Sequence, residues 1–391
     1  MQPLIYLWIA FALNYIDRQM VYSMLPALER DLGFSPVAIA WVGTLFLWSY
    51  TPAMPLAGYL ADRYRRDRII LASLILWSAS TIGCGLAASP ASFLFWRVMM
   101  GLTEALYYPT ALALLATHYP ESQRSRALGI HQSAQFAGGI FGGWYGGWAA
   151  DNAGWRTAFL AAGAAGLIFS PIMLRGMPAS PPPPPTSEAA ASPWAIVQSF
   201  PFLLLAATFS AYCSMQWIFF AWFPTFLRER FQLSMTLSGS WATLFVQGAI
   251  IVGILVGGFL ADRLQPKWPN SRIGITAAGA FLCAPFAYGA FSTDSLALSL
   301  GLSSGFGLFA GGLSANAFAA AFQLVDPRLR GLAAGILNMS GGFASGGMIL
   351  VAGYYRTTIG FGPLMLVTMA TTMLLAAWLF AVKAMPSRRI Q

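Results

Sequence analysis

Residues 41–86 read WVGTLFLWSYTPAMPLAGYLADRYRRDRIILASLILWSASTIGCGL, and this stretch decides the fold. Two apolar runs, each about twenty residues long, flank a segment from Asp62 to Arg68 in which all residues but Tyr64 are charged. A run of that length is what an α-helix needs to cross the hydrocarbon core of a bilayer. The stretch therefore predicts two membrane-spanning helices joined by a charged turn.

The same pattern continues through all 391 residues, of which 57% are hydrophobic and only 9% are charged. Soluble domains carry about 25% charged residues, so this chain has too little polar surface to face water. We expect an all-α polytopic membrane protein with about twelve spans. The apolar stretches lie at residues 3–28, 37–60, 69–87, 92–116, 126–150, 156–174, 199–227, 237–260, 273–292, 295–324, 332–355 and 362–382.

Basic residues are distributed unevenly among the connections. Of the 22 Lys and Arg residues, 15 lie in loops after even-numbered stretches or near the carboxy terminus, and 5 lie on the opposite side. The positive-inside rule then predicts a multi-pass protein of the cell inner (plasma) membrane with both termini cytoplasmic. The net charge of +9 is thereby interpreted as a topology signal, and no nucleic-acid partner is expected.

The longest connection, residues 175–198, contains five consecutive prolines from Pro181 to Pro185. Such a run favours an extended, semi-rigid spacer. We expect it to be a cytoplasmic linker between an amino-terminal six-helix bundle, residues 1–174, and a carboxy-terminal six-helix bundle, residues 199–391.

The two halves repeat each other, because LADR at residues 60–63 recurs at residues 260–263. Internal repeats are typical of transporters whose site lies at the bilayer midplane between the repeats. The stretch GYLADRYRR, residues 58–66, resembles the loop signature of the major facilitator superfamily, except that Arg65 replaces its usual glycine. This resemblance implies two pseudo-symmetric bundles latched on the cytoplasmic side. The implied gate residues, which otherwise serve only topology, are Asp62, Arg63, Asp262 and Arg263.

Within that superfamily the chain resembles the anion:cation symporters, which include hexuronate and galactonate carriers, sialin and the vesicular glutamate transporters. Spinster-like lysolipid transporters share much of the same pattern. The matching residues are NYIDR at 14–18, Arg97, Gly101, Glu104 and Pro109 in the fourth stretch, GWR at 154–156, and WFP at 222–224.

Four charged residues lie deep within the predicted spans: Asp17, Arg18, Arg97 and Glu104. Each costs about 2.5 to 3.5 kcal/mol at a helix centre, so each must face a cavity or another charge. Arg97 and Glu104 are two helical turns apart and share one helix face. We expect a cluster where the first and fourth spans meet. It is either a structural double salt bridge or a transport site, and intramembrane ionisable residues favour the transport site.

Protonation of a buried carboxylate would release its arginine to bind an anion through two hydrogen bonds. The family resemblance assigns proton coupling to Asp17 and Glu104, a coupling role to Arg18, and contact with the anion to Arg97. The prediction is proton-coupled symport of a small carboxylate or sugar acid by alternating access. The alternative is spinster-like transport of lysolipids or other amphipathic acids.

Polar residues near the cluster complete the predicted substrate site. The resemblance matches Tyr15, Tyr50, Gln135 and Asn338 to substrate-contact positions. Tyr108 and His131 are further candidates from the same spans. Any of them can instead join two helices by a hydrogen bond, at about 0.6 kcal/mol, and His131 can alternatively relay protons.

Other function classes receive no support from the sequence. No nucleophile–base pair, phosphate loop or metal spacing stands out, so we expect neither an enzyme nor a bound cofactor or metal. A receptor or scaffold would need loops large enough for a partner, and these loops are mostly short. The expected partners are the anion, protons and the lipid bilayer, and the expected state is a monomer.

Overall fold

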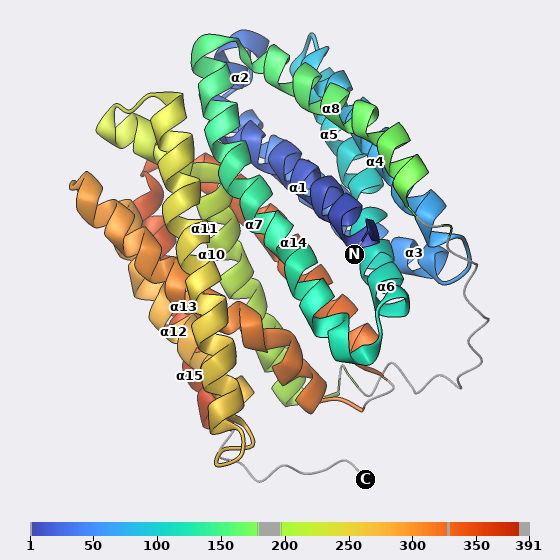
Figure 1. Cartoon of the computed structure of the whole chain (residues 1–391). Coiled ribbons are helices and arrows are strands. Elements are labelled where there is room, and N and C mark those ends of the chain that lie inside the picture. The colour runs from blue at the N-terminus through green and yellow to red at the C-terminus, as the bar shows by residue number, and fades with distance from the viewer. Residues whose placement is uncertain (1, 178, 180–195, 197, 327–328, 383–391) are drawn as a thin grey trace. The chain divides into compact units, whose positions relative to one another are not determined.

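The computed structural model describes residues 2–177, 179, 196, 198–326 and 329–382. All regular structure within these residues is helical, which confirms the predicted fold class (Figure 1). The predicted proline spacer at Pro181–Pro185 and the basic residues Lys383, Arg388 and Arg389 lie outside the described residues.

The predicted apolar stretches coincide with helices whose ends differ by a few residues. The first span is α1 (Gln2–Ser23) followed by α2 (Leu25–Leu32), and the fourth is α5 (Pro90–Glu104) followed by α6 (Tyr107–His118). The others are η1 (Ala38–Ala40) with α3 (Trp41–Ala61), α4 (Arg66–Gly85), α7 (Glu121–Asn152), α8 (Trp155–Gly176), α10 (Phe200–Phe231), α11 (Met235–Leu264), α12 (Ser271–Ser292), α13 (Leu296–Gln323), α14 (Arg330–Thr358) and α15 (Phe361–Val382).

Among the described residues, nine helical segments are long and apolar enough to cross a membrane. The remaining spans, α1, α3 and α7, are not among these nine, and α1 contains Asp17 and Arg18. Both split spans have a proline just beyond the break, at Pro26 and Pro109. A proline has no N–H for the carbonyl four residues earlier, which weakens the helix at that point.

Two compact units make up the chain. The first unit comprises Met1–Ser187 and Phe220–Thr243, and the second unit comprises Glu188–Phe219 and Leu244–Gln391. Helices α10 and α11 therefore contribute residues to both units. The predicted domain limits at residues 174 and 199 stay a prediction.

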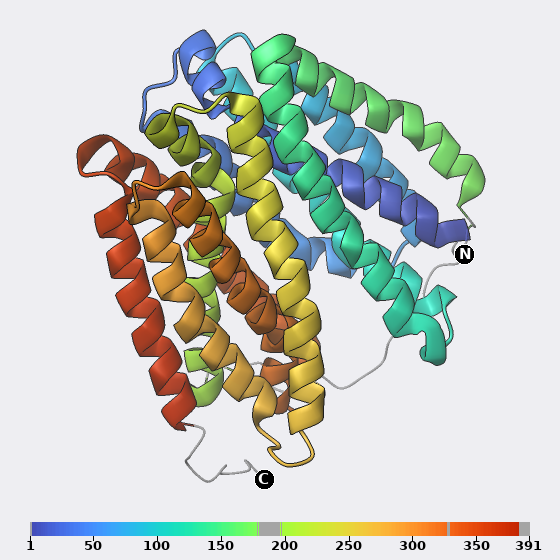
Figure 2. The same cartoon turned by 60° about the vertical axis from the view of Figure 1, so that its left-hand side comes forward.

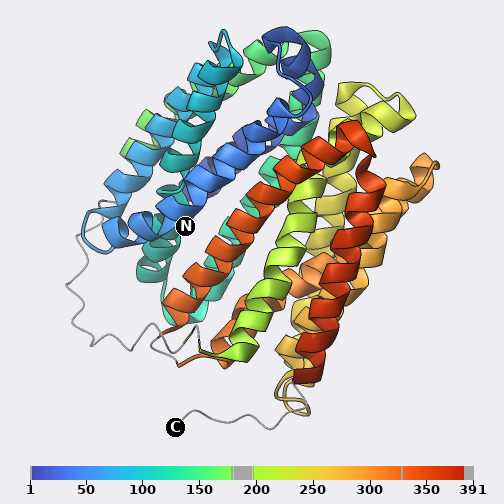
Figure 3. The same ribbon diagram turned by 180° about the vertical axis from the view of Figure 1, so that it is seen from behind.

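In the first unit, α1 packs along α7 (Figure 1). Gly138, Gly142 and Gly146 form a stripe on α7 at every fourth residue, and an added Cβ at each would meet the α1 backbone. Small residues at this spacing let two helix backbones approach closely. In the same unit α4 packs on α8, and both α3 and α4 pack on α5 (Figure 3).

The GWR motif joins several helices at one end of the first unit. Gly154 has a φ of 82°, a left-handed value that suits glycine at the turn before α8. Trp155 Nε1 donates to Asp31 Oδ2 at 3.2 Å. Arg156 Nη1 donates to the carbonyls of Gly85 and Ala87 at 3.2 and 2.6 Å, which supplies partners at the carboxy end of α4.

The loop signature has a similar structural role at the other end of these helices. Arg66 Nε donates to the Ala61 carbonyl at the end of α3, at 3.1 Å. Arg66 Nη1 donates to the Ala113 carbonyl and to Thr117 Oγ1 of α6, at 3.2 and 3.3 Å. The buried Arg66 thus ties α3, α4 and α6 together.

In the second unit, α12 packs on both α13 and α15 (Figure 2). Tyr212 of α10 and Ser314 of α13 share a hydrogen bond of 2.6 Å between their hydroxyl oxygens. Asn316 Nδ2 of α13 donates to the Gly257 carbonyl of α11 at 3.1 Å. This unit is therefore held by apolar packing with a few hydrogen bonds between neutral groups.

Candidate functional site

A buried ion pair joins the first and fourth spans. Arg18 Nε of α1 donates to Glu104 Oε2 at 2.6 Å, where Glu104 is the last residue of α5. The Glu104 side chain is 0% exposed and that of Arg18 is 7% exposed. Helix α5 ends at Glu104, at the break that precedes α6. The structure thus places these two predicted site residues in direct contact.

Aromatic rings surround the Arg18 guanidinium. Its Cζ lies 4.2 Å from the ring centroid of Tyr50, 5.0 Å from that of Tyr15 and 5.1 Å from that of Phe46. Cation–π contacts of this kind are stronger when the cation is removed from water. Tyr15 and Tyr50, two of the predicted substrate residues, are half-buried and contact Arg18 directly.

Asp17 faces a different helix from its neighbour Arg18. Its Oδ2 accepts a hydrogen bond from Thr81 Oγ1 of α4 at 3.2 Å, and the residue is 3% exposed. Consecutive helical residues point about 100° apart, which explains why Asp17 and Arg18 reach different partners. Asp17 is nevertheless close enough to interact electrostatically with Glu104 and Arg97.

Arg97 is fully buried on α5, at 0% exposure. Its Nε donates to the Val42 carbonyl at 3.2 Å, its Nη1 lies 3.0 Å from Met100 Sδ, and its Cζ is 4.6 Å from the Phe46 ring centroid. Its Nη2 has no hydrogen-bond partner among the described residues, and the same is true of Glu104 Oε1. The nearest neutral side chains to these two groups are Tyr22 beside Arg97 and Asn14 beside Glu104.

Unused hydrogen-bonding atoms in a buried site are costly, at about 1 to 3 kcal/mol each and more for charged groups. Water or a ligand relieves that cost. Glu104 forms its ion pair with Arg18, and Arg97 forms none within the part of the chain that the structure describes.

The remaining first-unit candidates lie on α6 and α7. Gln132 Nε2 donates to Tyr108 Oη at 3.0 Å, and Tyr108 and Gln135 are half-buried. His131 is completely buried and stacks on Phe11 with the ring centroids 4.5 Å apart.

His131 belongs to a hydrogen-bonded chain across three helices. Tyr107 Oη donates to the Leu7 carbonyl at 2.5 Å and lies 3.1 Å from His131 Nε2. Because the phenol has one proton, which Leu7 accepts, Nε2 must carry the imidazole proton and donate to Tyr107. The sequence left two roles open for His131, and this bond is the one in which His131 joins two helices. A role in relaying protons stays a prediction.

The other predicted residues are placed as follows. Asn338 is exposed on α14 of the second unit. Asp62 lies 4.0 Å from Arg66, and Arg63 Cζ lies 4.0 Å from the ring centroid of Tyr59, all within the first unit. In the second unit Asp262 accepts from Arg272 Nη2 at 2.9 Å, and Arg263 is in the last turn of α11. Each charged loop therefore has partners within its own unit.

Sequence reasoning missed two residues of the cluster, Phe46 and Thr81. Phe46 contacts both guanidiniums with one ring, and Thr81 is the hydrogen-bond donor to Asp17. Neither carries a distinguishing signal, because a phenylalanine or threonine in a membrane helix is more often simple packing. Only their position between charged residues of other helices identifies them.

Comparison with known proteins agrees with this architecture. The model of the Major Facilitator Superfamily matches residues 7–347. A D-galactonate transporter of Escherichia coli O6:H1 is 24% identical over 92% of this chain and 90% of its own. Protein spinster homolog 1 of Bos taurus is 28% identical over 71% of this chain and 57% of its own.

A solved structure has the same fold. It is that of a bacterial homolog of the human lysosomal transporter Spinster, in an inward-facing and occupied conformation. The TM-score is 0.78 at 19% identity, and the match covers 97% of this chain and 96% of the other. With a family match over residues 7–347, this chain is a multi-pass membrane transporter, not an enzyme, and belongs to the Major Facilitator Superfamily.

Proposed function

We propose that the protein is a proton-coupled symporter of a small organic anion, either a carboxylate or a sugar acid, that works by alternating access. The observation that carries the proposal is the buried Arg18–Glu104 pair next to Arg97, whose Nη2 and the Glu104 Oε1 are without partners. The D-galactonate transporter among the relatives supports a sugar acid as the substrate class.

The first step is protonation of Glu104. A neutral carboxyl no longer balances the Arg18 guanidinium, so the 2.6 Å ion pair weakens and Arg18 becomes free to bind another anion. An entering carboxylate then accepts hydrogen bonds from the arginines, with Arg97 as its principal contact. A guanidinium favours this role because its donors match both carboxylate oxygens.

Tyr15, Tyr50, Tyr108 and Gln135 are proposed to contact the rest of the substrate from the first unit. Their side chains are half-buried, and the rings of Tyr15 and Tyr50 lie 5.0 and 4.2 Å from Arg18 Cζ. Asn338 of the second unit is proposed as a further substrate contact. His131 is proposed to support the site through its hydrogen bond with Tyr107. A sugar acid would use these groups for its hydroxyls.

Asp17 is proposed as a second proton site. It is buried, at 3% exposure, and accepts a hydrogen bond from the neutral Thr81 hydroxyl at 3.2 Å. The proposed location is a bacterial inner membrane. The distribution of basic residues fits an orientation in which both termini are cytoplasmic. The charged loops at Asp62–Arg63 and Asp262–Arg263 then lie on the cytoplasmic side, where they are proposed to gate the pathway.

A second candidate is transport of lysolipids or other amphipathic acids. The spinster homolog among the relatives favours it, as do the hydrogen bonds between neutral groups that join α13 to α10 and α11 in the second unit. An amphipathic acid would place its head group on the arginines of the first unit. The two candidates differ in the substrate and not in the charged cluster.

The test is uptake by purified protein reconstituted into liposomes with an acidic outside buffer. D-galactonate and a lysophospholipid serve as labelled probes, with and without a protonophore. We expect D-galactonate to accumulate and the protonophore to abolish its accumulation. Accumulation of the lysophospholipid alone would support the second candidate, and accumulation of D-galactonate that ignores the pH gradient would contradict proton coupling.

A further inference from the structure

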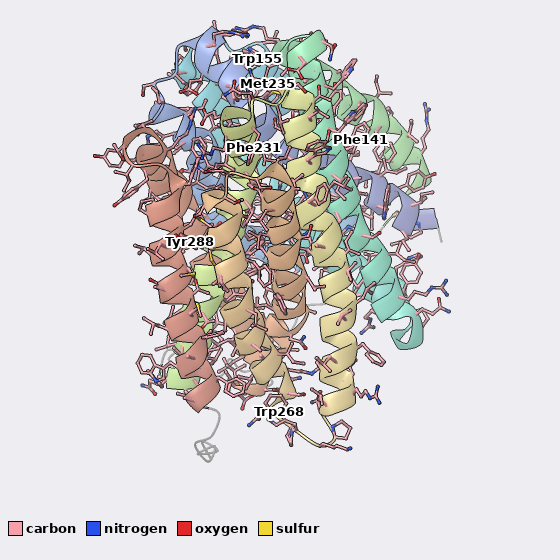
Figure 4. All side chains as sticks on the ribbon, turned by 90° about the vertical axis from the view of Figure 1, so that its left-hand side faces the viewer. Phe141, Trp155, Phe231, Met235, Trp268 and Tyr288 are labelled. Carbon is pink, nitrogen blue, oxygen red and sulfur yellow. The ribbon has the colours of Figure 1, made fainter. Side chains whose placement is uncertain are left out.

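Tyr107 and Tyr108 are consecutive residues of α6, and their hydroxyls have different surroundings. Tyr107 is fully buried and bonds to the Leu7 carbonyl. Consecutive helical residues point about 100° apart, so Tyr108 faces another direction. It is half-buried and meets Gln132 of α7, the helix on which Phe141 is labelled in Figure 4. Tyr108 is therefore the more accessible of the two hydroxyls.

The hydrogen bond between Tyr108 and Gln132 has only one possible direction. Gln132 Nε2 lies 3.0 Å from Tyr108 Oη, and an amide nitrogen donates but does not accept. The phenol oxygen is therefore the acceptor, and the phenol keeps its own proton. The structure shows no acceptor for that proton within the residues that it describes. Tyr108 thus offers one hydrogen-bond donor.

The other end of the Gln132 amide offers an acceptor. Gln132 Oε1 is shielded from solvent and has no hydrogen-bond partner within the described part of the chain. A donor on Tyr108 and an acceptor on Gln132 therefore lie side by side, because the two side chains are in contact. A ligand hydroxyl both donates and accepts, so it matches this pair, whereas a carboxylate only accepts.

The ring of Tyr108 has a fixed place relative to Arg18. It stacks on Phe11 of α1, which is 2% exposed, with the ring centroids 5.6 Å apart and the planes 21° apart. The Tyr15 ring meets the same Phe11 edge-on at 5.1 Å, and it lies 5.0 Å from Arg18 Cζ. Tyr108 is also close enough to Tyr15 and Tyr50 to interact with them electrostatically. A ligand whose carboxylate lies on Arg18 therefore has Tyr108 within the same aromatic cluster.

We infer that Tyr108 and Gln132 form a subsite that recognises one hydroxyl group of the substrate. The Tyr108 hydroxyl donates to the ligand oxygen, and Gln132 Oε1 accepts the ligand's own hydroxyl proton. The inference rests on the proposed function and narrows the substrate class from any small carboxylate to a polyhydroxy acid. A ligand without that hydroxyl leaves a donor and an acceptor of the protein unpaired, which weakens its binding.

The test is equilibrium binding of D-galactonate and of its analogues that each lack one hydroxyl, measured by calorimetry with the purified protein at one fixed pH. We expect the wild type to bind one analogue about tenfold or more weakly than D-galactonate. Tyr108→Phe keeps the ring that stacks on Phe11 but has no hydroxyl, so it should bind this analogue and D-galactonate nearly equally. Equal affinity of the wild type for all analogues, or unchanged discrimination in Tyr108→Phe, overturns the inference.

Gln132→Met tests the acceptor, because methionine is similar in length and has no amide. We expect it to lose discrimination to the same extent as Tyr108→Phe, and the double variant to lose no more than either single variant. Ser133→Ala is the matched control. Ser133 is the next residue of α7, but its hydroxyl accepts from Trp8 Nε1 at 3.0 Å. Full discrimination in Gln132→Met, or additive losses in the double variant, would remove Gln132 from the subsite.

Uptake into liposomes separates this inference from the proposed function, because binding at one fixed pH does not depend on proton coupling. If the analogue pattern holds but uptake of D-galactonate ignores the pH gradient, proton coupling is wrong and the hydroxyl subsite stands. If uptake follows the pH gradient but no analogue is discriminated, the subsite is wrong and proton-coupled transport stands. A wild-type protein that does not bind D-galactonate overturns the subsite together with the sugar-acid substrate.

Discussion

The buried carboxylates Asp17 and Glu104 have different partners although both lie in the first unit. Glu104 pairs with a guanidinium at 2.6 Å, whereas Asp17 accepts a hydrogen bond from the neutral Thr81 hydroxyl. Protonating Glu104 therefore breaks an ion pair, while protonating Asp17 removes a negative charge without breaking an ion pair. The two residues are suited to different steps, Glu104 to releasing Arg18 and Asp17 to adjusting the charge of the cluster.

This difference leads to a prediction for neutral variants of both acids. Asp17→Asn and Glu104→Gln fix the side chain in a form that resembles the protonated acid, so a pH gradient no longer acts on it. We expect both to lose gradient-driven accumulation and to retain counterflow between two pools of substrate. The measurement is D-galactonate uptake in liposomes, with the exposed Asp31→Asn as control. Normal accumulation in both variants would show that the protons bind elsewhere.

Arg97 allows a second prediction at this scale. Its guanidinium uses Nε for the Val42 carbonyl and still has Nη2 without a partner among the described residues. A lysine keeps the charge but cannot hold the carbonyl and an anion at the same time. We expect Arg97→Lys to weaken substrate binding about tenfold or more, as measured by calorimetry or substrate-dependent thermal stabilisation. An unchanged affinity would remove Arg97 from the substrate site.

The sequence made the four buried charges conspicuous, because each is expensive in a membrane. It also indicated that the first and fourth spans meet through them. It could not indicate which arginine pairs with which acid, since Arg97 shares a helix face with Glu104 whereas Arg18 lies on a different span. Phe46 was equally hidden, because its role depends on lying between two guanidiniums from different helices.

At the scale of the helix, the packing of α7 depends on where each glycine points. An added Cβ at Gly142 would lie 2.9 Å from the Ile16 carbonyl oxygen of α1, whereas one at Gly129 would meet nothing within 4 Å. Both residues are in α7, so they differ mainly in their neighbours. The sequence alone does not indicate which row of glycines on α7 faces α1.

We therefore predict opposite effects of the same substitution at these two sites. Gly142→Ala forces α1 and α7 apart and should lower stability by about 1 to 3 kcal/mol. Gly129→Ala should be neutral or stabilising by up to about 1 kcal/mol, because alanine favours the helix. Thermal unfolding of the two variants in detergent measures the difference. Equal unfolding temperatures would show that the α1–α7 contact tolerates a wider spacing.

Helix breaks were less predictable than helix positions. The apolar stretches located the spans to within a few residues because their length is set by the bilayer. The breaks after Ser23 and Glu104 were not predicted, although Pro26 and Pro109 lie just beyond them. A proline inside an apolar run can bend a membrane helix or leave it continuous, and the choice depends on neighbouring helices that the sequence does not specify.

At the scale of the whole molecule, the charge moved in each cycle depends on how many of the buried acids take up a proton. One proton with a monovalent anion transfers no net charge, so only the pH gradient drives uptake. A second proton adds one positive charge per cycle. The membrane potential then contributes about 2.3 kcal/mol per 100 mV, which corresponds to roughly fiftyfold further accumulation.

The presence of both Asp17 and Glu104 favours the second case. We predict that an inside-negative potassium diffusion potential, imposed with valinomycin at equal pH, drives D-galactonate into liposomes that contain the wild-type protein. The driving force should disappear in Asp17→Asn, because a variant that has lost its coupling to protons carries no net positive charge inward with the anion. Exposed Asp31→Asn should respond like the wild type. A wild-type protein that ignores the potential while still responding to pH would carry one proton per anion, and Asp17 would then act only through the field it exerts on Glu104 and Arg97.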